Sequence, residues 1–301
     1  MKVAKGLGLG GFILASTFSA SKTSSIWMQE TLQSPKYRKI FQSLFEQRSL
    51  VWEFSRRHLE SQHRGSVAGL AWMILNPILI FSVYAFVFMV VFTAKYTDDG
   101  RETRFEFALA LFVSIQVANF VIDVMQVSPL SIVQQGNYVK KVVFPLEVLP
   151  VSHVLAAFVR CILASGLVIG LKVIIGGGVG WTIVWFPVIL LLIFVGALGI
   201  ALGLSAIGVF LRDIVPLVQC VSIILMFTSG VFFSISNLPN GFGFLRWNPL
   251  LAAIESSRRV IVWNQVPEAA SLGVVAASAI GLYLLGASLF KTLRPAFADV
   301  L

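Results

Sequence analysis

Two ionisable residues lie inside long apolar stretches, and these two side chains are the ones most able to do chemistry there. Asp123 stands near the end of one stretch and Arg160 about midway along another. Ionisable groups in such surroundings are costly and commonly mark a path for a polar substrate. Their expected depths differ by roughly 10 Å at 1.5 Å per residue, so no direct ion pair is predicted. Arg160 is expected to face a polar path or, as the plainer alternative, to bond backbone carbonyls within a bundle.

No pattern for catalysis or metal binding accompanies these residues in the sequence. The chain has no GxxxxGK[ST] phosphate loop and no cluster of metal ligands, and its histidines, His58, His63 and His153, are scattered. Cys161 and Cys220 fall in apolar runs, where a cysteine is typically a buried small hydrophobe. We therefore expect that the chain is not itself an enzyme and holds no cofactor or metal of its own.

The composition places the chain in a membrane. Hydrophobic residues make up 57% of it and charged residues 12%, with a mean hydropathy of +0.87. A soluble domain with so little charge could not cover its own surface. The net charge of +9 would suit nucleic acid in a soluble protein, but here positive cytoplasmic loops and anionic lipid headgroups explain it better.

Six stretches come close to the length of about 20 apolar residues that the hydrocarbon core requires. They predict an all-α membrane protein with both termini on one side. Placing the termini in the cytoplasm puts most of the 23 Lys and Arg residues there, as the positive-inside rule requires, and leaves Lys172 and Arg258 among the outer charges. In the fourth stretch, Gly199 and Gly203 form a GxxxG pair that predicts close helix packing. The predicted spans are Leu70–Phe92, Phe107–Met125, Val148–Val173, Ile183–Leu211, Ile214–Phe233 and Leu272–Leu289.

The chain before the first span divides into two parts. Residues 1–33 begin like a signal peptide, but Phe18 stands where cleavage after Ala20 needs a small residue. We interpret them as a weakly ordered cytoplasmic extension. Residues 34–66 predict a helix with one apolar and one basic face, suited to the inner membrane interface or to a partner protein. Residues 67–301 form the predicted six-span domain.

The segment 127–145, between the second and third spans, is too polar to cross the membrane. A short helix is expected over Ser131–Gln135, followed by a turn. A short basic element held against the membrane could serve as a handle for another protein, although such segments are more often plain connecting loops. The residues of this candidate handle are Gln135, Gly136, Asn137, Tyr138, Lys140 and Lys141.

The segment 234–270, between the fifth and sixth spans, is too broken to cross the membrane and too apolar for an ordinary loop. Leu250–Trp263 has helical periodicity, with Asn248 as a cap and Pro249 at the first helical position. Re-entrant or interfacial helices at the outer face are predicted. The candidate outer-gate residues are Trp247, Asn248, Pro249, Arg258 and Arg259.

Aromatic residues and an internal proline mark a candidate substrate path. Aromatic side chains recur at intervals of three and four residues along the first span, and others cluster at the end of the fifth. Their rings could offer the C–H faces of sugars an apolar track, although packing in the bundle or against lipid is commoner. Asn76-Pro77 could kink the first span and widen the path. The candidate path residues are Trp72, Asn76, Pro77, Phe81, Tyr84, Phe88, Phe92, Arg160, Phe227, Phe232 and Phe233.

Several motifs resemble those of the permease subunits of polysaccharide-export ABC transporters, which are type II ABC exporters. The first-span signature of that family, R-G-S-x-x-G-x-x-W with a later N-P, is matched by "HRGSVAGLAWMILNPILIFSVYAFVF". The stretch "YVKKVVFPLEVLP" resembles the family's cytoplasmic coupling region. Further matching stretches follow in the family's order, namely "GVFLRDI", "FFSISNLP", "RWNPLLAAIESSRRVIV" and the terminal "FADVL". The resemblance runs from Arg48 to Leu301 and is closer to O-antigen exporters than to capsule or teichoic-acid exporters.

This resemblance implies a homodimer of six-span subunits in the bacterial inner membrane, with two separate ATPase subunits that bind ATP and Mg²⁺ below it. The stretch from Ser131 to Lys141 would be the coupling helix, and the chain after Phe233 would form the outer gate. The substrate would be an undecaprenyl-diphosphate-linked glycan that threads between the subunits. Alternatives are export of small drugs or lipids, a membrane-embedded transferase, and a scaffold without transport. The inner loops hold few acidic residues, which argues against the transferase.

Overall fold

The computed structural model describes residues 47–61, 69–87, 103–136, 138, 144–175, 178–233 and 243–300. The predicted extension 1–33 and residues 34–46 of the predicted interface helix lie outside this part of the chain. So do several single residues to which the sequence assigns a role or a place, namely His63, Phe88, Phe92, Asn137, Lys140 and Lys141.

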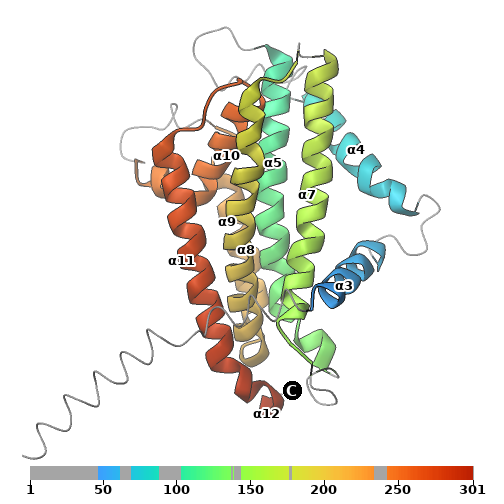
Figure 1. Cartoon of the computed structure of the whole chain (residues 1–301), viewed down its shortest axis with the longest axis vertical. Helices are drawn as coiled ribbons and strands as arrows, with labels where there is room; N and C mark the ends of the chain where they lie inside the picture. The colour runs from blue at the N-terminus through green and yellow to red at the C-terminus, as the bar shows by residue number, and fades with distance from the viewer. Residues whose placement is uncertain are drawn as a thin grey trace, which may run out of the picture. The chain divides into compact units, whose positions relative to one another are not determined.

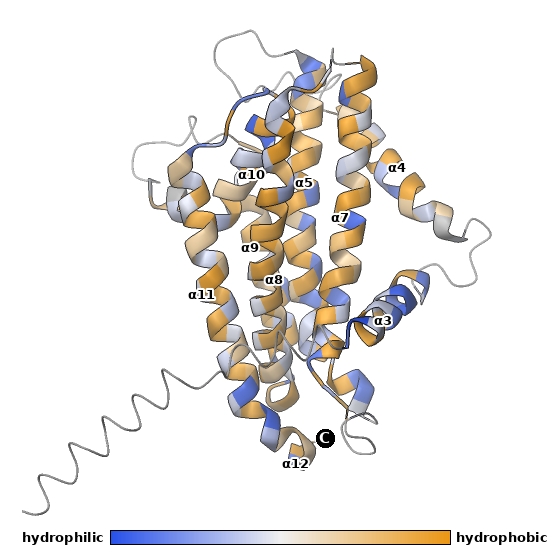
Figure 2. Ribbon diagram, viewed as in Figure 1, coloured by the Kyte–Doolittle hydropathy of each residue, from blue (hydrophilic) through white to orange (hydrophobic). Residues whose placement is uncertain are grey.

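Every regular element in the described ranges is a helix, as the hydropathy predicts (Figure 1). Four of these helices, with their flanking 3₁₀ turns, are long and apolar enough to cross a membrane. They correspond to the predicted second, third, fourth and sixth spans, and hydrophobic residues dominate along them (Figure 2). These four are α5 (Arg104–Val127), α7 (Val148–Ile175), α8 (Trp185–Phe210) and α11 (Ala269–Leu293).

The first and fifth predicted spans correspond to shorter apolar helices, α4 (Trp72–Phe86) and α9 (Ile214–Thr228), of 15 residues each. At 1.5 Å per residue each covers about 22 Å, less than the roughly 30 Å of a hydrocarbon core. The prediction that the fifth span reaches Phe233 is wrong. The chain leaves α9 at Ser229, and Gly230 takes a left-handed conformation with φ of 69°, which ends helices and favours glycine.

α9 is attached loosely to the rest of the described chain. It buries only Ile214, Val218 and Ser222, so most of its apolar side chains remain exposed. Cys220 is one of the exposed residues, and its predicted burial is therefore wrong, whereas Cys161 on α7 is buried as expected. An apolar run indicates that a residue avoids water, but it does not tell whether protein or lipid covers that residue.

α5 is the central helix of the bundle. It packs against α4, α7, α8, α9 and the shorter helix α10 (Pro249–Ile261), and nearly all its residues from Phe107 to Met125 are buried. A helix that is apolar on every side is suited to this position. Its start is fixed by a capping box, in which Thr103 Oγ1 accepts from the Glu106 amide at 3.2 Å and Glu106 Oε2 accepts from the Thr103 amide at 2.9 Å.

α8 and α11 make the most extensive contact between two helices in the described ranges. Their backbones touch at glycines. A Cβ added to Gly199 would overlap the backbone of Leu282, and one added to Gly286 would overlap the Gly199 carbonyl. The close packing predicted from the GxxxG pair is therefore confirmed, because small residues let two helices in lipid approach to backbone contact.

α3 (Arg48–Ser61) packs beside the early part of α7 (Figure 1). Val51, Phe54 and Leu59 form its buried face, while its outer face carries ion pairs of Arg56 with Glu60 and of Arg57 with Glu53. Val51, Phe54 and Leu59 of the predicted apolar face are thus buried, whereas Trp52, which the sequence also places on that face, is exposed. Ser55 Oγ also donates to the Ser152 carbonyl of α7 at 3.0 Å, so the helix is docked by a polar contact as well as by apolar ones.

Candidate functional site

The described residues of the candidate handle, Gln135, Gly136 and Tyr138, follow the end of α5 and precede the start of α7. Two 3₁₀ turns follow α5 here, η3 (Ser128–Leu130) and η4 (Val133–Gln135). Only η4 falls within Ser131–Gln135, where the sequence predicts a short helix. η3 packs tightly on α8, since a Cβ on Gly208 would overlap the Pro129 carbonyl. The Tyr138 ring lies edge-on to Phe54 of α3 at 5.7 Å, so the described part of this segment contacts both α3 and α8.

An ion pair that sequence reasoning missed holds the same end of the bundle together. The buried carboxylate of Glu147, just before α7, lies 2.6 Å from the Arg294 guanidinium in the turn η8 (Arg294–Ala296). The start of α7 and the end of α11 therefore lie at one end, as their assignment to one side of the membrane predicts. Beyond η8, Phe297 of α12 (Phe297–Val300) is buried and its ring lies 5.6 Å from that of Phe290.

α4 carries the described first-span residues of the predicted path, and it lies at the edge of the bundle. None of its residues is fully buried, and Asn76 is exposed. Pro77 lies inside the helix, where its missing N–H leaves the Met73 carbonyl without its usual helical partner. Phe81 packs edge-on against Phe112 of α5 at 5.2 Å, which favours the packing explanation for that ring. Trp72 and Tyr84 are partly buried.

Phe227 and Phe232, at and just beyond the end of α9, are more exposed than Trp72, Phe81 and Tyr84, the candidate path aromatics of α4. The rings of Phe227 and Phe232 lie 5.6 Å apart and both face outward from the described chain. Phe233 is partly buried, and its backbone carbonyl accepts a hydrogen bond from Arg258 at 3.4 Å. The backbone of Phe233 therefore connects the chain just beyond α9 to Arg258 of the candidate gate.

The helix predicted within the outer-gate region is confirmed as α10. Asn248 caps it, its Oδ1 accepting from the Leu250 amide at 3.0 Å, and Pro249 takes the first helical position, as predicted. Asn248 Nδ2 also donates to the Thr228 carbonyl at the end of α9. α10 packs against α5, α8 and α11, so it lies deeper in protein than an interfacial helix would. Trp247, just before it, is exposed.

Arg258 is buried inside the protein, with 1% of its surface exposed, although the sequence places it among the charges of the outer loops. Its guanidinium donates to Ser114 Oγ of α5 at 2.7 Å and to the carbonyls of Gly230 and Phe233 just beyond α9. Glu255 lies 3.4 Å away. Carbonyls at a helix C-terminus lack partners within the helix and carry negative potential, which explains why a cation is stable there.

Lys172 near the end of α7 is buried in the same way, 4% exposed, and was also expected among the outer charges. Its ammonium donates to the Ile261 and Val262 carbonyls at the end of α10 and to Asn264 Oδ1, at 2.5, 2.7 and 2.9 Å. Asn264 adopts a left-handed conformation with φ of 53° and also accepts from the Gly180 amide. Three donors thus meet three acceptors, so the buried charge is fully bonded.

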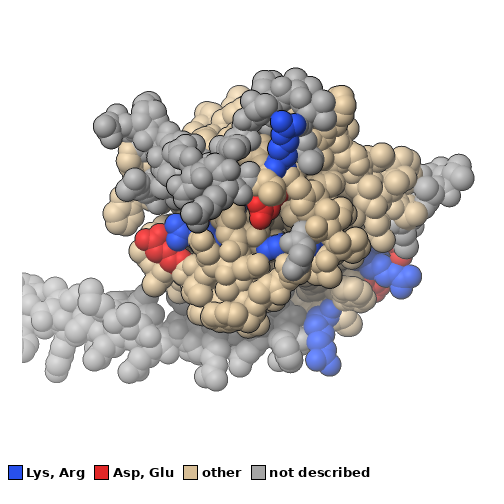
Figure 3. Space-filling view, turned by 90° about the horizontal axis from the view of Figure 1, so that it is seen from above, with Lys and Arg blue, Asp and Glu red and all other residues tan. Residues whose placement is uncertain are grey.

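Figure 3 views the described bundle from above, at the end that holds Lys172 and Arg258, and few charged side chains are visible there. Arg259, a candidate gate residue, is half-exposed and lies 3.7 Å from Glu255 and 4.0 Å from Glu268. The described gate residues therefore differ in kind. Arg258 is a structural anchor, whereas Trp247 and Arg259 are accessible.

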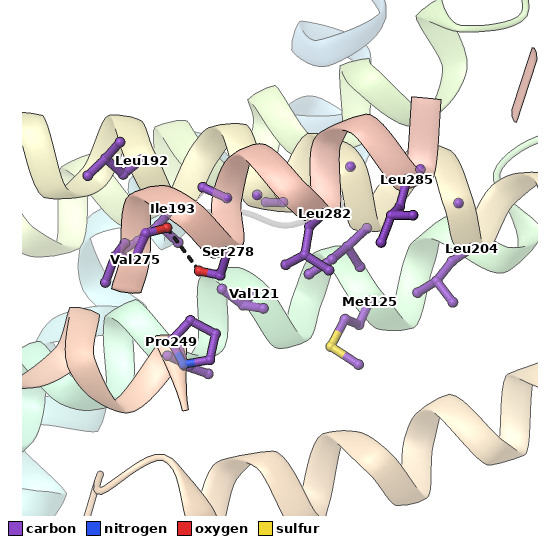
Figure 4. A pocket seen from close by; sticks show the side chains of 18 of the residues that line it. Val121, Met125, Leu192, Ile193, Leu204, Pro249, Val275, Ser278, Leu282 and Leu285 are labelled. Atoms are coloured by element: carbon purple, nitrogen blue, oxygen red, sulfur yellow. Dashed lines mark hydrogen bonds between the residues drawn. The ribbon is translucent and has the colours of Figure 1, made fainter. Parts of the chain in front are cut away.

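An apolar cavity of about 730 Å³ lies between α5, α8, α9, α10 and α11. Figure 4 shows Leu282 and Leu285 on one wall with Val121 and Met125 on another, and Ser278 already bonded to the Val275 carbonyl. Its polar groups are few, and the glycines of the α8–α11 contact are among its lining residues. The cavity is suited to hydrocarbon rather than to a sugar, so it is not the polar path that the sequence predicts.

A second, smaller cavity lies where α3, α5 and α7 meet, and it contains Asp123 and Arg160. The prediction that these two do not touch is wrong, since Arg160 Nη2 lies 3.4 Å from Asp123 Oδ2. A depth estimate from Cα positions neglects the length of the arginine side chain, which can extend along a bundle to reach a partner. His58 of α3 and His153 of α7 stack beside this pair, with ring centroids 3.7 Å apart.

Acidification is expected to loosen α3 from α7. Burial and, second, the positive charge of Arg160 lower the pKa of His58 from its usual 6.5. Because the docked state disfavours protonation, its stability is full above pH 6.5 and falls as the pH drops through the lowered pKa. The groups facing His58 are His153 and Arg160 of α7 and Asp123 of α5.

Hydrogen exchange of α3 at pH 7.5 and 5.5, corrected for intrinsic rates, measures this effect. Protection should fall at the lower pH in the unchanged chain and should change much less in His58→Gln. Equal loss of protection in both proteins would contradict the assignment to His58.

Comparison with known proteins identifies the family. The model of the ABC-2 type transporter family matches residues 49–262. The chain is 26% identical over 264 residues to the O-antigen export system permease protein RfbA of Myxococcus xanthus, covering 87% of this chain and 98% of that protein. It is 22% identical over 254 residues to a Klebsiella pneumoniae protein of the same name, covering 84% and 95%. The family region spans nearly all of α3 and runs to the end of α10, so the chain belongs to the ABC-2 type transporter family.

Proposed function

We propose that this chain is the permease subunit of an ABC exporter that carries a lipid-linked polysaccharide, O-antigen, from the inner leaflet of the bacterial inner membrane to the periplasm. The observation that carries the proposal is the match over 95–98% of the length of proteins named as O-antigen export permeases. The all-helical apolar bundle is consistent with it. Export of small drugs or lipids, or of capsule or teichoic acid, remains the alternative.

The working unit in this proposal is a homodimer of six-span subunits with cytoplasmic termini. α4 and α9 would complete the membrane domain as its first and fifth spans, together with the residues that flank them. Both carry exposed apolar faces, which in a dimer could meet the partner or lipid. Two separate ATPase subunits would bind ATP and Mg²⁺ and push on the segment from Gln135 to Lys141. The contacts of η3 with α8 and of Tyr138 with α3 support this coupling role.

The glycan in this proposal passes along α4 and the end of α9 and leaves beside α10. Asn76-Pro77 would shape the inner part of the path, and the exposed rings of Phe227 and Phe232 would provide an apolar surface for sugars. Trp247 and Arg259 are the accessible residues at the proposed outer gate, which α10 supports from within.

Reconstitution with a partner ATPase subunit tests the proposal. In vesicles, ATP should drive a lipid-linked glycan to the far side, and Lys140→Gln with Lys141→Gln should lower the rate at least tenfold because the ATPase loses its handle. The matched control is Arg56→Gln with Arg57→Gln, which removes two exposed charges from α3. Transport of small amphiphiles without glycan would favour the alternative substrate, and a chain that binds no ATPase would contradict the proposal.

A further inference from the structure

The cavity between α3, α5 and α7 has a volume of about 160 Å³ and a polar lining. His58 and Ser61 line it from α3, Asp123 from α5, and His153 and Arg160 from α7. Titratable side chains from three helices therefore converge on one small space. No group of metal-ligating residues occurs in the described chain, so these side chains do not form a metal site there.

The hydrogen bonding of this cavity is incomplete. His58 Nε2 is buried and has no hydrogen-bond partner among the described residues. Buried polar atoms nearly always have a partner, so an unsatisfied one indicates a missing ligand or water. The contact between Arg160 and Asp123, at 3.4 Å, is long for a charge-assisted bond. Both side chains also remain partly exposed, so a ligand can compete for the guanidinium.

The position of the cavity indicates which ligands can reach it. Asp123 lies four residues before the end of α5, at the end of the bundle that also holds η3 and the start of α7. α3, which forms one wall, is amphipathic and has a charged outer face, as expected of a helix at the membrane interface. The cavity therefore lies near the depth of lipid headgroups, with the hydrocarbon beside it.

We propose that this cavity binds the phosphate group of a membrane lipid, with Arg160 as its charged donor and His58 as a second donor. A guanidinium pairs with phosphate in a planar, bidentate geometry, and a histidine Nε2–H adds a further bond. Asp123 holds the guanidinium while the site is empty and gives way to the phosphate when it binds. That the phosphate belongs to the exported lipid rests on the proposed function, whereas the site itself does not.

Asp123 distinguishes a phosphate site from a purely structural ion pair. If the pair only stabilises the fold, Asp123→Asn and Arg160→Gln should act in the same direction. If the cavity binds phosphate, Asp123→Asn removes a competing anion and should tighten binding severalfold. Arg160→Gln should instead weaken binding about tenfold or more, because it removes a hydrogen bond to a charged group.

Titration of the full chain in detergent micelles with farnesyl phosphate tests the proposal. Farnesol, which lacks the phosphate, should bind weakly and equally to every variant. His58→Gln should weaken binding of the phosphate, Arg160→Lys should retain more of it than Arg160→Gln, and Arg56→Gln on the outer face of α3 should bind like the unchanged chain. Thermal melts of each variant separate loss of the site from loss of the fold.

Competition with a second lipid phosphate shows which kind of lipid supplies the bound phosphate. Either result of this competition supports the phosphate site. Displacement by dihexanoyl phosphatidic acid would indicate a site for any lipid phosphate, and resistance to it a site for the polyprenyl carrier. Binding of farnesol as tight as that of farnesyl phosphate, or equal binding by folded Arg160→Gln, would overturn the proposal. Because binding is measured without the ATPase, either outcome is independent of whether the complex transports a glycan.

Discussion

Gly199→Ala is expected to destabilise the helix bundle by about 1–3 kcal/mol, although alanine is the better helix former. The added Cβ would overlap the Leu282 backbone on α11, which cannot rotate away as a side chain can. The helices must therefore separate, and their contact, the most extensive among the described elements, weakens. The midpoint of thermal unfolding in detergent, followed by tryptophan fluorescence, measures the change.

Gly281→Ala is the matched control for this prediction. Gly281 lies on α11, and nothing stands within 4 Å of the position its Cβ would take. This change should leave the bundle unaltered or stabilise it by up to about 1 kcal/mol, since helical glycine is the costlier residue. Gly286→Ala acts at the contact with Gly199, so the two destabilising changes should not add. A Gly199→Ala chain as stable as Gly281→Ala would contradict the close approach.

Arg258→Met is expected to cost roughly 3–5 kcal/mol, the range for removing one partner of a buried charged network. Methionine keeps an unbranched apolar stem but leaves Ser114 Oγ and the carbonyls of Gly230 and Phe233 without the guanidinium. Among the described residues, Glu255 then keeps its contact with Arg259 at 3.7 Å. We expect the ends of α9 and α10 to lose hydrogen-exchange protection first, because Arg258 joins them.

Arg259→Met separates this effect from loss of charge alone. Arg259 is half-exposed and its ion pairs are long, so its loss should change stability by less than about 1 kcal/mol. Arg258→Lys should recover part of the stability, since a lysine can still donate to a carbonyl. If Arg258→Met and Arg259→Met melt together, Arg258 does not anchor the helix ends as the distances indicate.

Apolar periodicity and local capping signals predicted much of this fold. The spans that became α5, α7, α8 and α11 were identified from hydropathy, because the length of an apolar run is a local property of the chain. Asn248-Pro249 predicted the start of α10, and Gly199 with Gly203 predicted a close helix contact. The capping box of Thr103 and Glu106 was not predicted, although its signal needs only residues three apart.

The fate of single charged side chains depended on the tertiary structure. The sequence placed Lys172 and Arg258 among the charges of the outer side and predicted no direct ion pair between Asp123 and Arg160. The structure buries the first two and joins the second pair. Each outcome depends on which helix ends and side chains lie nearby, and that is set by packing between distant segments. The same holds for the cavity that brings His58 toward Arg160, since α3 and α7 are far apart in the chain.

The sequence by itself determined that this chain is an all-helical membrane protein, where most of its spans lie and which family its motifs resemble. These properties follow from hydrophobicity and short-range spacing, which act residue by residue. Only the tertiary structure decided which ionisable groups anchor helices and which line a cavity, because the stability of a charge in lipid depends on the carbonyls, hydroxyls and counter-charges within hydrogen-bonding distance.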